Sequence, residues 1–198
     1  MVWLIGDKGM LGSEVSRQLT ENKIQWFGSD REVDITNSAE LRKFATSHGP
    51  AADTTGLSVR KRRIPEKITW IINCAAYTAV DKAESEPELA EALNAEGALN
   101  IARVAREIGA KLIHISTDYV FDGKGNVPYT EEDPKNPSGV YGKTKAEGER
   151  EIEKEMTLYY ILRTASLYGF EGKNFVYTMT KAMNEKDSVK VVNDQKGT

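Results

Sequence analysis

Short runs of β-branched and aromatic residues alternate along this chain with longer stretches whose apolar residues recur at helical spacing. The β-rich runs lie at 2–6, 24–28, 68–75, 111–116, 158–163 and 189–192, and the helical stretches at 11–20, 37–46, 86–108, 139–154 and 173–185. Strands that alternate with helices usually pair in parallel, and a parallel sheet needs helices on both faces. The sequence therefore predicts an α/β fold with a Rossmann-like doubly wound parallel sheet.

The longest helical stretch, 86–108, is predicted to be a single helix that covers the sheet. Its apolar residues fall largely on one side, namely Leu89, Leu93, Ala98, Ile101, Val104 and Ala105.

Composition limits the partners and the compartment that can be expected. The formal net charge of −3 gives no broad attraction to nucleic acid. The one basic run, at 60–63, lies beside small polar residues that favour a solvated loop. No apolar run approaches the roughly 18 residues of a membrane span, and the single cysteine, Cys74, permits no disulfide within the chain. These features predict a cytoplasmic protein with neither a nucleic-acid nor a membrane partner.

The first β-rich run leads directly into GDKGMLG, in which Gly6, Gly9 and Gly12 form a GxxGxxG pattern at the start of a helix. Glycines allow a tight turn and close approach of the backbone, and a helix N-terminus offers free N–H groups to a pyrophosphate. A glycine pattern alone is a weak signal. Its position between a first strand and a helix predicts a dinucleotide cofactor.

The second β-rich run ends in GSDREVD and leaves the choice between NADH and NADPH open. Asp30 would favour NADH by binding the adenosine ribose, whereas Ser29 with Arg31 would favour NADPH by accommodating a 2′-phosphate. Asp34 is a candidate for a contact on the adenine side, and a solvated loop acid is the alternative.

Candidate catalytic residues follow the fourth β-rich run. That run continues into ISTDYVFDG, so Ser116, Thr117 and Asp118 lie at the carboxyl edge, where open α/β sheets bind ligands. Tyr141 and Lys145 stand four residues apart at the start of a helix and therefore share one helical face. A neighbouring positive charge favours the phenolate, so Lys145 is predicted to lower the pKa of Tyr141 for proton transfer in carbonyl chemistry.

The same tyrosine–lysine spacing recurs at Tyr177 and Lys181. No cluster of hydroxyl residues ends the strand before this second pair. We therefore favour Tyr141 and Lys145 as the functional pair.

Several segments together make the chain resemble the dTDP-4-dehydrorhamnose reductases, which are extended members of the short-chain dehydrogenase/reductase superfamily. The segments are the glycine loop, NCAAYTAVDKAESEPE, ISTDYVFDG, VYGKTKAEGE and VVNDQKGT, and the resemblance covers nearly the whole chain. It implies reduction of the C4 ketone of dTDP-4-dehydro-L-rhamnose to dTDP-L-rhamnose by NADPH or NADH.

The resemblance also implies a catalytic triad of Thr117, Tyr141 and Lys145. With the loop pattern, it predicts cofactor contacts from Gly6, Gly9, Met10, Leu11, Gly12, Asp30, Asp34, Ile35, Ala75, Ala76, Tyr77, Thr78, Tyr141 and Lys145. The predicted substrate contacts are Val80, Ser116, Thr117, Asp118 and Ser166. No residue is predicted to bind a metal. Mg²⁺ and a homodimer enter through the resemblance alone, and the matched residues do not place them.

The chain departs from the family pattern at three places. Ser166 stands where the family usually has a substrate-contacting tryptophan, which favours a related nucleotide-sugar reductase or epimerase as an alternative. Residues 49–67 lengthen a connection and are expected to form a surface insertion. The family continues well past Thr198. We therefore expect 1–165 to form an NAD(P)-binding Rossmann domain, with 166–198 beginning a largely missing substrate lobe that contains a late sheet strand.

A third interpretation is a non-catalytic regulatory subunit that keeps the dinucleotide-binding fold. Such relatives typically lose the tyrosine or the lysine, and this chain keeps both Tyr141 and Lys145.

Overall fold

Five of the predicted strands pair in parallel to form one sheet. The computed structural model describes residues 1–48 and 67–191. The strands are β1 (Val2–Ile5), β2 (Trp26–Ser29), β3 (Trp70–Asn73), β4 (Lys111–Thr117) and β5 (Tyr159–Thr164). Their order is β2-β1-β3-β4-β5. Ile5 of β1, which lies between β2 and β3, pairs with Ser29 on one side and Asn73 on the other.

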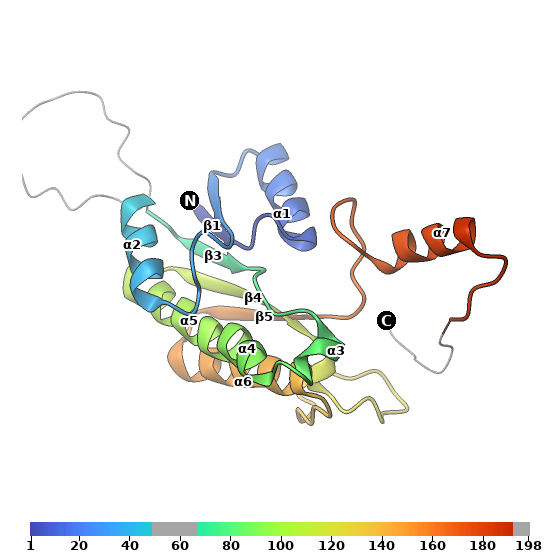
Figure 1. Cartoon of the computed structure of the whole chain (residues 1–198). Helices are drawn as coiled ribbons and strands as arrows, with labels where there is room; N and C mark the ends of the chain where they lie inside the picture. Colours follow the sequence, from blue (N-terminus) through green and yellow to red (C-terminus); the bar gives the residue numbers. More distant parts are fainter. Residues whose placement is uncertain (49–66, 192–198) are drawn as a thin grey trace, which may run out of the picture.

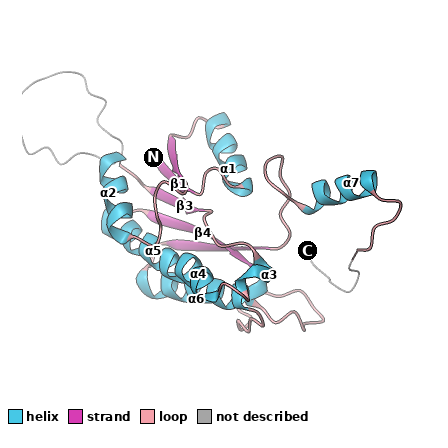
Figure 2. Ribbon diagram, viewed as in Figure 1, coloured by secondary structure: helices cyan, strands magenta, loops and turns pink. Residues whose placement is uncertain are grey.

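Helices lie on both faces of the sheet, as Figures 1 and 2 show. α1 (Met10–Glu21) packs on one face, whereas α2 (Ser38–His48), α5 (Gly97–Ile108) and α6 (Val140–Glu155) lie on the other. The remaining elements are α3 (Val80–Ala83), α4 (Pro87–Glu91), the π-helical η1 (Ala92–Glu96), the 3₁₀ turn η2 (Asp118–Val120) and α7 (Phe175–Glu185). The predicted α/β class with a doubly wound parallel sheet is confirmed.

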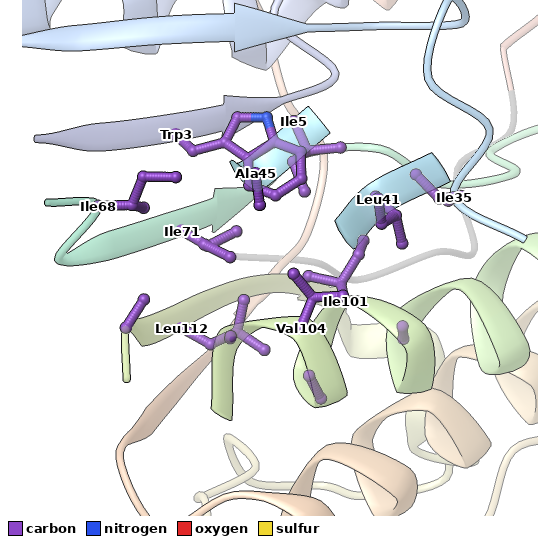
Figure 3. Close-up of a cluster of buried hydrophobic side chains, with 14 of the residues drawn as sticks. Trp3, Ile5, Ile35, Leu41, Ala45, Ile68, Ile71, Ile101, Val104 and Leu112 are labelled. Carbon is purple, nitrogen blue, oxygen red and sulfur yellow. The ribbon is translucent and has the colours of Figure 1, made fainter. Parts of the chain in front are cut away.

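The main hydrophobic core fills the layer between the sheet and α2, α5 and α6. Alternate residues of a strand point to the same face, so Trp3 and Ile5 of β1 both enter this layer, where they lie near Ile71 of β3 (Figure 3). Ile101 and Val104 of α5 meet them from the other side, and all five side chains are at most 1% exposed. Burying a side chain of this size stabilises the fold by about 1.5–3 kcal/mol.

The predicted single helix at 86–108 is interrupted by one π-helical turn. The chain runs without a break through α4, η1 and α5, and Gly109 ends α5 in the left-handed conformation at φ 69°. A π turn adds a residue and rotates the preceding segment by about 100°. Leu89 is 48% exposed instead of facing the sheet, whereas Ala98 and Val104 are buried as predicted. At about 100° per residue, Leu89 lies about 180° from Ala98 even on a continuous α-helix, so the prediction was wrong for this residue.

The C-terminal part differs from the sequence prediction. Residues 189–191 form no strand, contrary to the strand predicted at 189–192, and residue 192 lies outside the described part of the chain. A short β-rich run forms a strand only where a free sheet edge meets it, because β-propensity depends on context. None of the residues of α7 is buried, and Tyr160 and Leu162 of β5 are 58% and 47% exposed.

Two other predictions bear on the overall organisation. The expected surface insertion at 49–67 falls almost wholly outside the described residues. None of the helices in the described ranges is long and apolar enough to cross a membrane. The division at residue 165 stays a prediction.

Candidate active site

The carboxyl ends of β1, β3 and β4 bring three of the predicted segments to one edge of the sheet. The glycine turn leaves β1 at Gly6, the segment 74–79 leaves β3, and β4 ends at Thr117. Because all strands are parallel, these ends lie side by side at the edge where open α/β sheets bind ligands.

The glycine turn is shaped by backbone contacts that side chains would obstruct. Gly6 adopts φ 79°, and its N–H donates to the Ser29 carbonyl at 2.6 Å. Gly9 caps α1, whose first turn contains no acidic residue, so the positive end of the helix is not neutralised locally. Met10, Leu11 and Gly12 follow in that first turn. This arrangement suits an anionic group such as a pyrophosphate.

Replacing Gly12 with alanine should destabilise the protein, because the new Cβ would collide with the carbonyl of Gly6. We expect a loss of about 1–3 kcal/mol or more in the free energy of unfolding, together with lost cofactor affinity. Gly9→Ala is the matched control, since its Cβ would come no closer than 3.4 Å to the Gly6 oxygen. Urea unfolding followed by tryptophan fluorescence checks both variants, and equal stabilities would contradict this packing.

The end of β2 narrows the cofactor question that the sequence left open. The Ser29 side chain is fully buried, and its hydroxyl accepts a hydrogen bond from the Trp3 indole at 2.9 Å. Ser29 is therefore buried away from a 2′-phosphate, whereas Arg31, the other residue of the NADPH alternative, is exposed. The choice between NADH and NADPH stays a prediction. Asp30 is the first residue beyond the strand.

Two further residues predicted for the cofactor serve the protein's own structure. Asp34 accepts hydrogen bonds from the N–H and hydroxyl of Thr36 at 2.9 and 2.8 Å and so stabilises its own loop. Ile35 is 6% exposed and belongs to the main core, where its side chain packs against Gly97. Ile35 is thus enclosed in the core, whereas Asp34 is exposed, and its contact with a cofactor stays a prediction.

A residue that the sequence analysis missed, Asn94 of η1, holds the segment after β3. Its side-chain oxygen accepts from the Tyr77 N–H at 2.8 Å, while its amide donates to the Tyr77 carbonyl and to the Thr144 hydroxyl of α6. The signal was an asparagine within an apolar helical stretch. The other predicted residues here are Ala75, Ala76 and Thr78 in the segment and Val80 at the start of α3.

Thr117 and Tyr141 meet at the end of β4. Thr117 is 6% exposed, and its hydroxyl donates to the carboxylate of Asp118 at 3.1 Å. Tyr141 is in the first turn of α6, partly buried, and its ring packs edge-on against Tyr119 with centroids 5.6 Å apart. Burial raises the pKa of Tyr141, and a hydrogen bond with Thr117 opposes that shift. The phenol is therefore protonated at neutral pH.

Lys145 lies one turn further along α6 and is 2% exposed. Its Nζ donates to the carbonyl oxygen of Ile115 at 2.7 Å and lies 3.3 Å from Nε2 of His114. Burial lowers the pKa of Lys145 to about 8. The predicted lowering of the Tyr141 pKa by Lys145 is not found in this geometry, since the only group that lowers it is Thr117.

The remaining predicted substrate residues differ in accessibility. Ser116 is 3% exposed, and its hydroxyl donates to Glu149 at 2.5 Å, so it stabilises the interior instead of presenting a free hydroxyl. Asp118 and Ser166 are both exposed, the first in η2 and the second in the loop after β5. The second tyrosine–lysine spacing is on α7, where Tyr177 donates to the Phe170 carbonyl.

Glu149 forms a buried charged cluster that the sequence analysis did not identify. The residue is fully buried, and its carboxylate accepts hydrogen bonds from Arg163 at 3.0 and 2.8 Å and contacts Lys135 at 3.0 Å. Burial raises the pKa of Glu149, but hydrogen bonds from Arg163, Ser116 and Lys135 outweigh it and lower the pKa overall. Its position four residues after Lys145 was a usable signal.

The part of the chain that the structure describes offers no obvious metal site. In residues 1–48 and 67–191, no three His, Cys, Asp or Glu side chains come together in a way that could hold a metal ion. The structure therefore assigns no residues to the Mg²⁺ implied by the resemblance.

A parallel sheet with a glycine turn after its first strand, and a threonine, tyrosine and lysine around its fourth, defines a dinucleotide-binding protein of the short-chain dehydrogenase/reductase type. The family model described as RmlD substrate binding domain matches residues 1–198, so the chain belongs to that family.

Named relatives agree with this assignment. The chain is 42% identical over 198 residues to dTDP-4-dehydrorhamnose reductase of Streptomyces griseus, covering 98% of this chain and 59% of the relative. It is 40% identical over 196 residues to the enzyme of the same name from Salmonella typhimurium, covering 99% and 61%. The chain thus spans about three fifths of the length of these relatives.

Two solved structures are similar to this chain both in fold and in sequence. A dTDP-4-dehydrorhamnose reductase from Clostridium acetobutylicum superposes with a TM-score of 0.85 at 41% identity, covering 98% of this chain and 63% of that one. The enzyme of the same name from Bacillus anthracis, solved in complex with NADP, gives 0.83 at 35% identity, covering 95% and 61%.

Proposed function

We propose that this chain belongs to an enzyme that reduces the C4 ketone of dTDP-4-dehydro-L-rhamnose to dTDP-L-rhamnose with NADH or NADPH. The observation that carries the proposal is the convergence of Thr117 and Tyr141, with Lys145 one turn behind, at the carboxyl edge beside the glycine turn. Relatives of that name, about 40% identical over nearly the whole chain, support the same reaction.

The reaction needs a proton donor and a group that holds the reacting oxygen. The nicotinamide, when bound, supplies the hydride that reduces the sugar carbonyl. Tyr141 is protonated in this environment and can give its proton to the developing alkoxide. Thr117 can hydrogen-bond the same oxygen, and Lys145 is proposed to bind the nicotinamide ribose hydroxyls. The open N-terminus of α1 fits the pyrophosphate of such a cofactor.

The surroundings of β2 favour NADH over NADPH. Asp30 follows the strand directly, and its N–H donates to the Glu32 carboxylate at 2.9 Å. Lys8 is already paired with Glu32 at 3.2 Å. Burial raises the pKa of the nearby Asp7, Lys8 opposes that shift, and Glu32 and Asp30 add to it, so three carboxylates lie close together here. These carboxylates would repel the 2′-phosphate of NADPH, whereas the ribose 2′-hydroxyl of NADH could donate a hydrogen bond to Asp30.

We expect NADH to bind this chain at least several-fold more tightly than NADPH. Fluorescence titration with each cofactor measures the ratio of the two Kd values. Asp30→Asn should shift that ratio toward NADPH, because it removes one of the charges facing the phosphate. Asp187→Asn, far along the chain beyond α7, serves as the control. Tighter binding of NADPH to the unmodified chain would contradict the preference.

The substrate is tested with a panel of nucleotide 4-keto sugars in the longest natural reading frame that contains this chain. Cofactor oxidation with dTDP-4-dehydro-L-rhamnose, and dTDP-L-rhamnose as product, is the expected result. Turnover of a different nucleotide sugar only would support the related reductase or epimerase suggested by Ser166, which is exposed in the loop after β5. Cofactor binding without turnover of any sugar would support the regulatory subunit.

We further propose a cytoplasmic location, from the apolar pattern and the single cysteine, and a homodimer, as the family resemblance implies. Sedimentation of the natural protein at several concentrations tests the dimer, and a monomer at all of them would contradict it.

A further inference from the structure

A row of buried polar side chains joins β3 to Lys145 behind the proposed active site. His114, in the middle of β4, is 1% exposed and has a neighbour on each ring nitrogen. Its Nδ1 lies 3.0 Å from the side-chain nitrogen of Asn73, and its Nε2 lies 3.3 Å from Nζ of Lys145. The proposed reaction uses neither His114 nor Asn73, so their place in this row needs its own explanation.

The backbone at Ala75 fixes the direction of these hydrogen bonds. The Ala75 N–H donates to the side-chain oxygen of Asn73 at 3.0 Å. A backbone N–H can only donate, so the amide oxygen of Asn73 must face Ala75 and its NH₂ group must face His114. Asn73 therefore donates to Nδ1 of His114, which must carry a lone pair. A neutral imidazole has one N–H, and that proton is then on Nε2.

The proton on Nε2 determines which protonation state of Lys145 fits beside it. An N–H at Nε2 points a donor at Nζ, and an ammonium has no lone pair with which to accept it. A free amine accepts from His114 and still donates to the Ile115 carbonyl at 2.7 Å. A charged lysine would leave two donors facing each other where Lys145 is 2% and His114 1% exposed, which is costly away from water.

We propose that Asn73 and His114 act as positioning residues that favour the neutral amine of Lys145 over its ammonium form in the cofactor-free chain, with the His114 proton on Nε2. A doubly protonated ring is excluded, because burial lowers the pKa of His114 well below its usual value. The other ionisable groups facing Lys145 are Cys74, after β3, and Glu149 of its own helix. Both would favour the charged lysine, but burial outweighs them.

The consequence for catalysis rests on the proposed function. With a midpoint near 8, Lys145 is mainly the neutral amine above about pH 8, where it does not favour the phenolate of Tyr141. Below that pH it takes up a proton and can do so. The assignment of the His114 tautomer does not depend on the proposed function, because it rests on hydrogen bonds within the chain.

Nitrogen NMR of the chain tests the tautomer directly. The chain has two histidines, so the exposed His48→Gln variant leaves only the His114 ring signals. At pH 9 we expect the Nε2–H tautomer, and we expect the Lys145 side chain, assigned with a Lys145→Met variant, to titrate with a midpoint near 8. A proton on Nδ1, or a Lys145 midpoint near the usual 10.5, would overturn the proposal.

The variant Asn73→Asp offers a second test, because aspartate has nearly the same shape as asparagine. A carboxylate can accept both from Ala75 and from Nδ1, so the His114 proton should move to Nδ1 and Nε2 should become an acceptor for a charged lysine. The Lys145 midpoint should then rise by at least about one pH unit, a tenfold change in proton affinity. The control Asn126→Asp adds the same charge at an exposed loop position and should change neither the His114 tautomer nor the Lys145 midpoint. An unchanged tautomer in a folded Asn73→Asp chain would contradict the proposal. Because neither experiment measures turnover, their outcome is separate from that of the proposed function.

Discussion

Tyr141→Phe is expected to lower kcat for the sugar ketone by about 10²–10⁴-fold, the usual contribution of a positioned proton donor. The variant keeps the partly buried ring, which packs against Tyr119, and loses only the phenolic hydroxyl. Cofactor affinity should therefore change by less than about twofold. Steady-state kinetics and fluorescence titration of the longest natural reading frame measure the two effects.

The second tyrosine of the same spacing is a matched control for this experiment. Tyr177 donates its hydroxyl to the Phe170 carbonyl at 3.2 Å on α7, away from Thr117. Tyr177→Phe should leave kcat within about twofold of the unmodified enzyme. Full activity of Tyr141→Phe, or a comparable loss in Tyr177→Phe, would remove Tyr141 from its proposed role.

Glu149→Gln is expected to destabilise the protein by about 3 kcal/mol, because it removes one partner of a buried ion cluster. Arg163 and Lys135 would keep their charges with side chains only 18% and 21% exposed, and Ser116 would lose a charged acceptor. Chemical denaturation measures the change. Glu153→Gln removes the other carboxylate that contacts Lys135, which is 39% exposed, and should cost less than about 1 kcal/mol.

The destabilisation by Glu149→Gln should depend on pH in a defined direction. The pKa of Glu149 is lowered in the folded protein, so its contribution is present above the unfolded value of 4.5 and is lost as the pH falls through the folded value. The difference between the two proteins should be constant near neutral pH and shrink below about pH 4.5. A difference that persists undiminished in acid would mean that the cluster contributes through packing and not through its charge.

The amino-acid sequence alone determined the class of fold and the candidate segments of the site. Strand and helix periods are local properties of the chain, and the five strands of the sheet start and end within two residues of their predicted limits. The glycine turn and the position of Tyr141 at the first turn of α6 were likewise readable, because turns and helix starts are specified by nearby residues. The strand predicted at 189–192 was not found in its described part, since a strand also needs a partner edge.

Only the tertiary structure decided which polar side chains are free and which are already bonded. From the sequence, Ser29 and Ser116 could both offer a free hydroxyl to a ligand. In the structure, the Ser29 hydroxyl is hydrogen-bonded to Trp3 and the Ser116 hydroxyl to Glu149. The Ile115 carbonyl and His114 surround Lys145, and burial alters its charge. Hydrogen-bond partners and desolvation come from residues far apart in the chain, so no local pattern contains them.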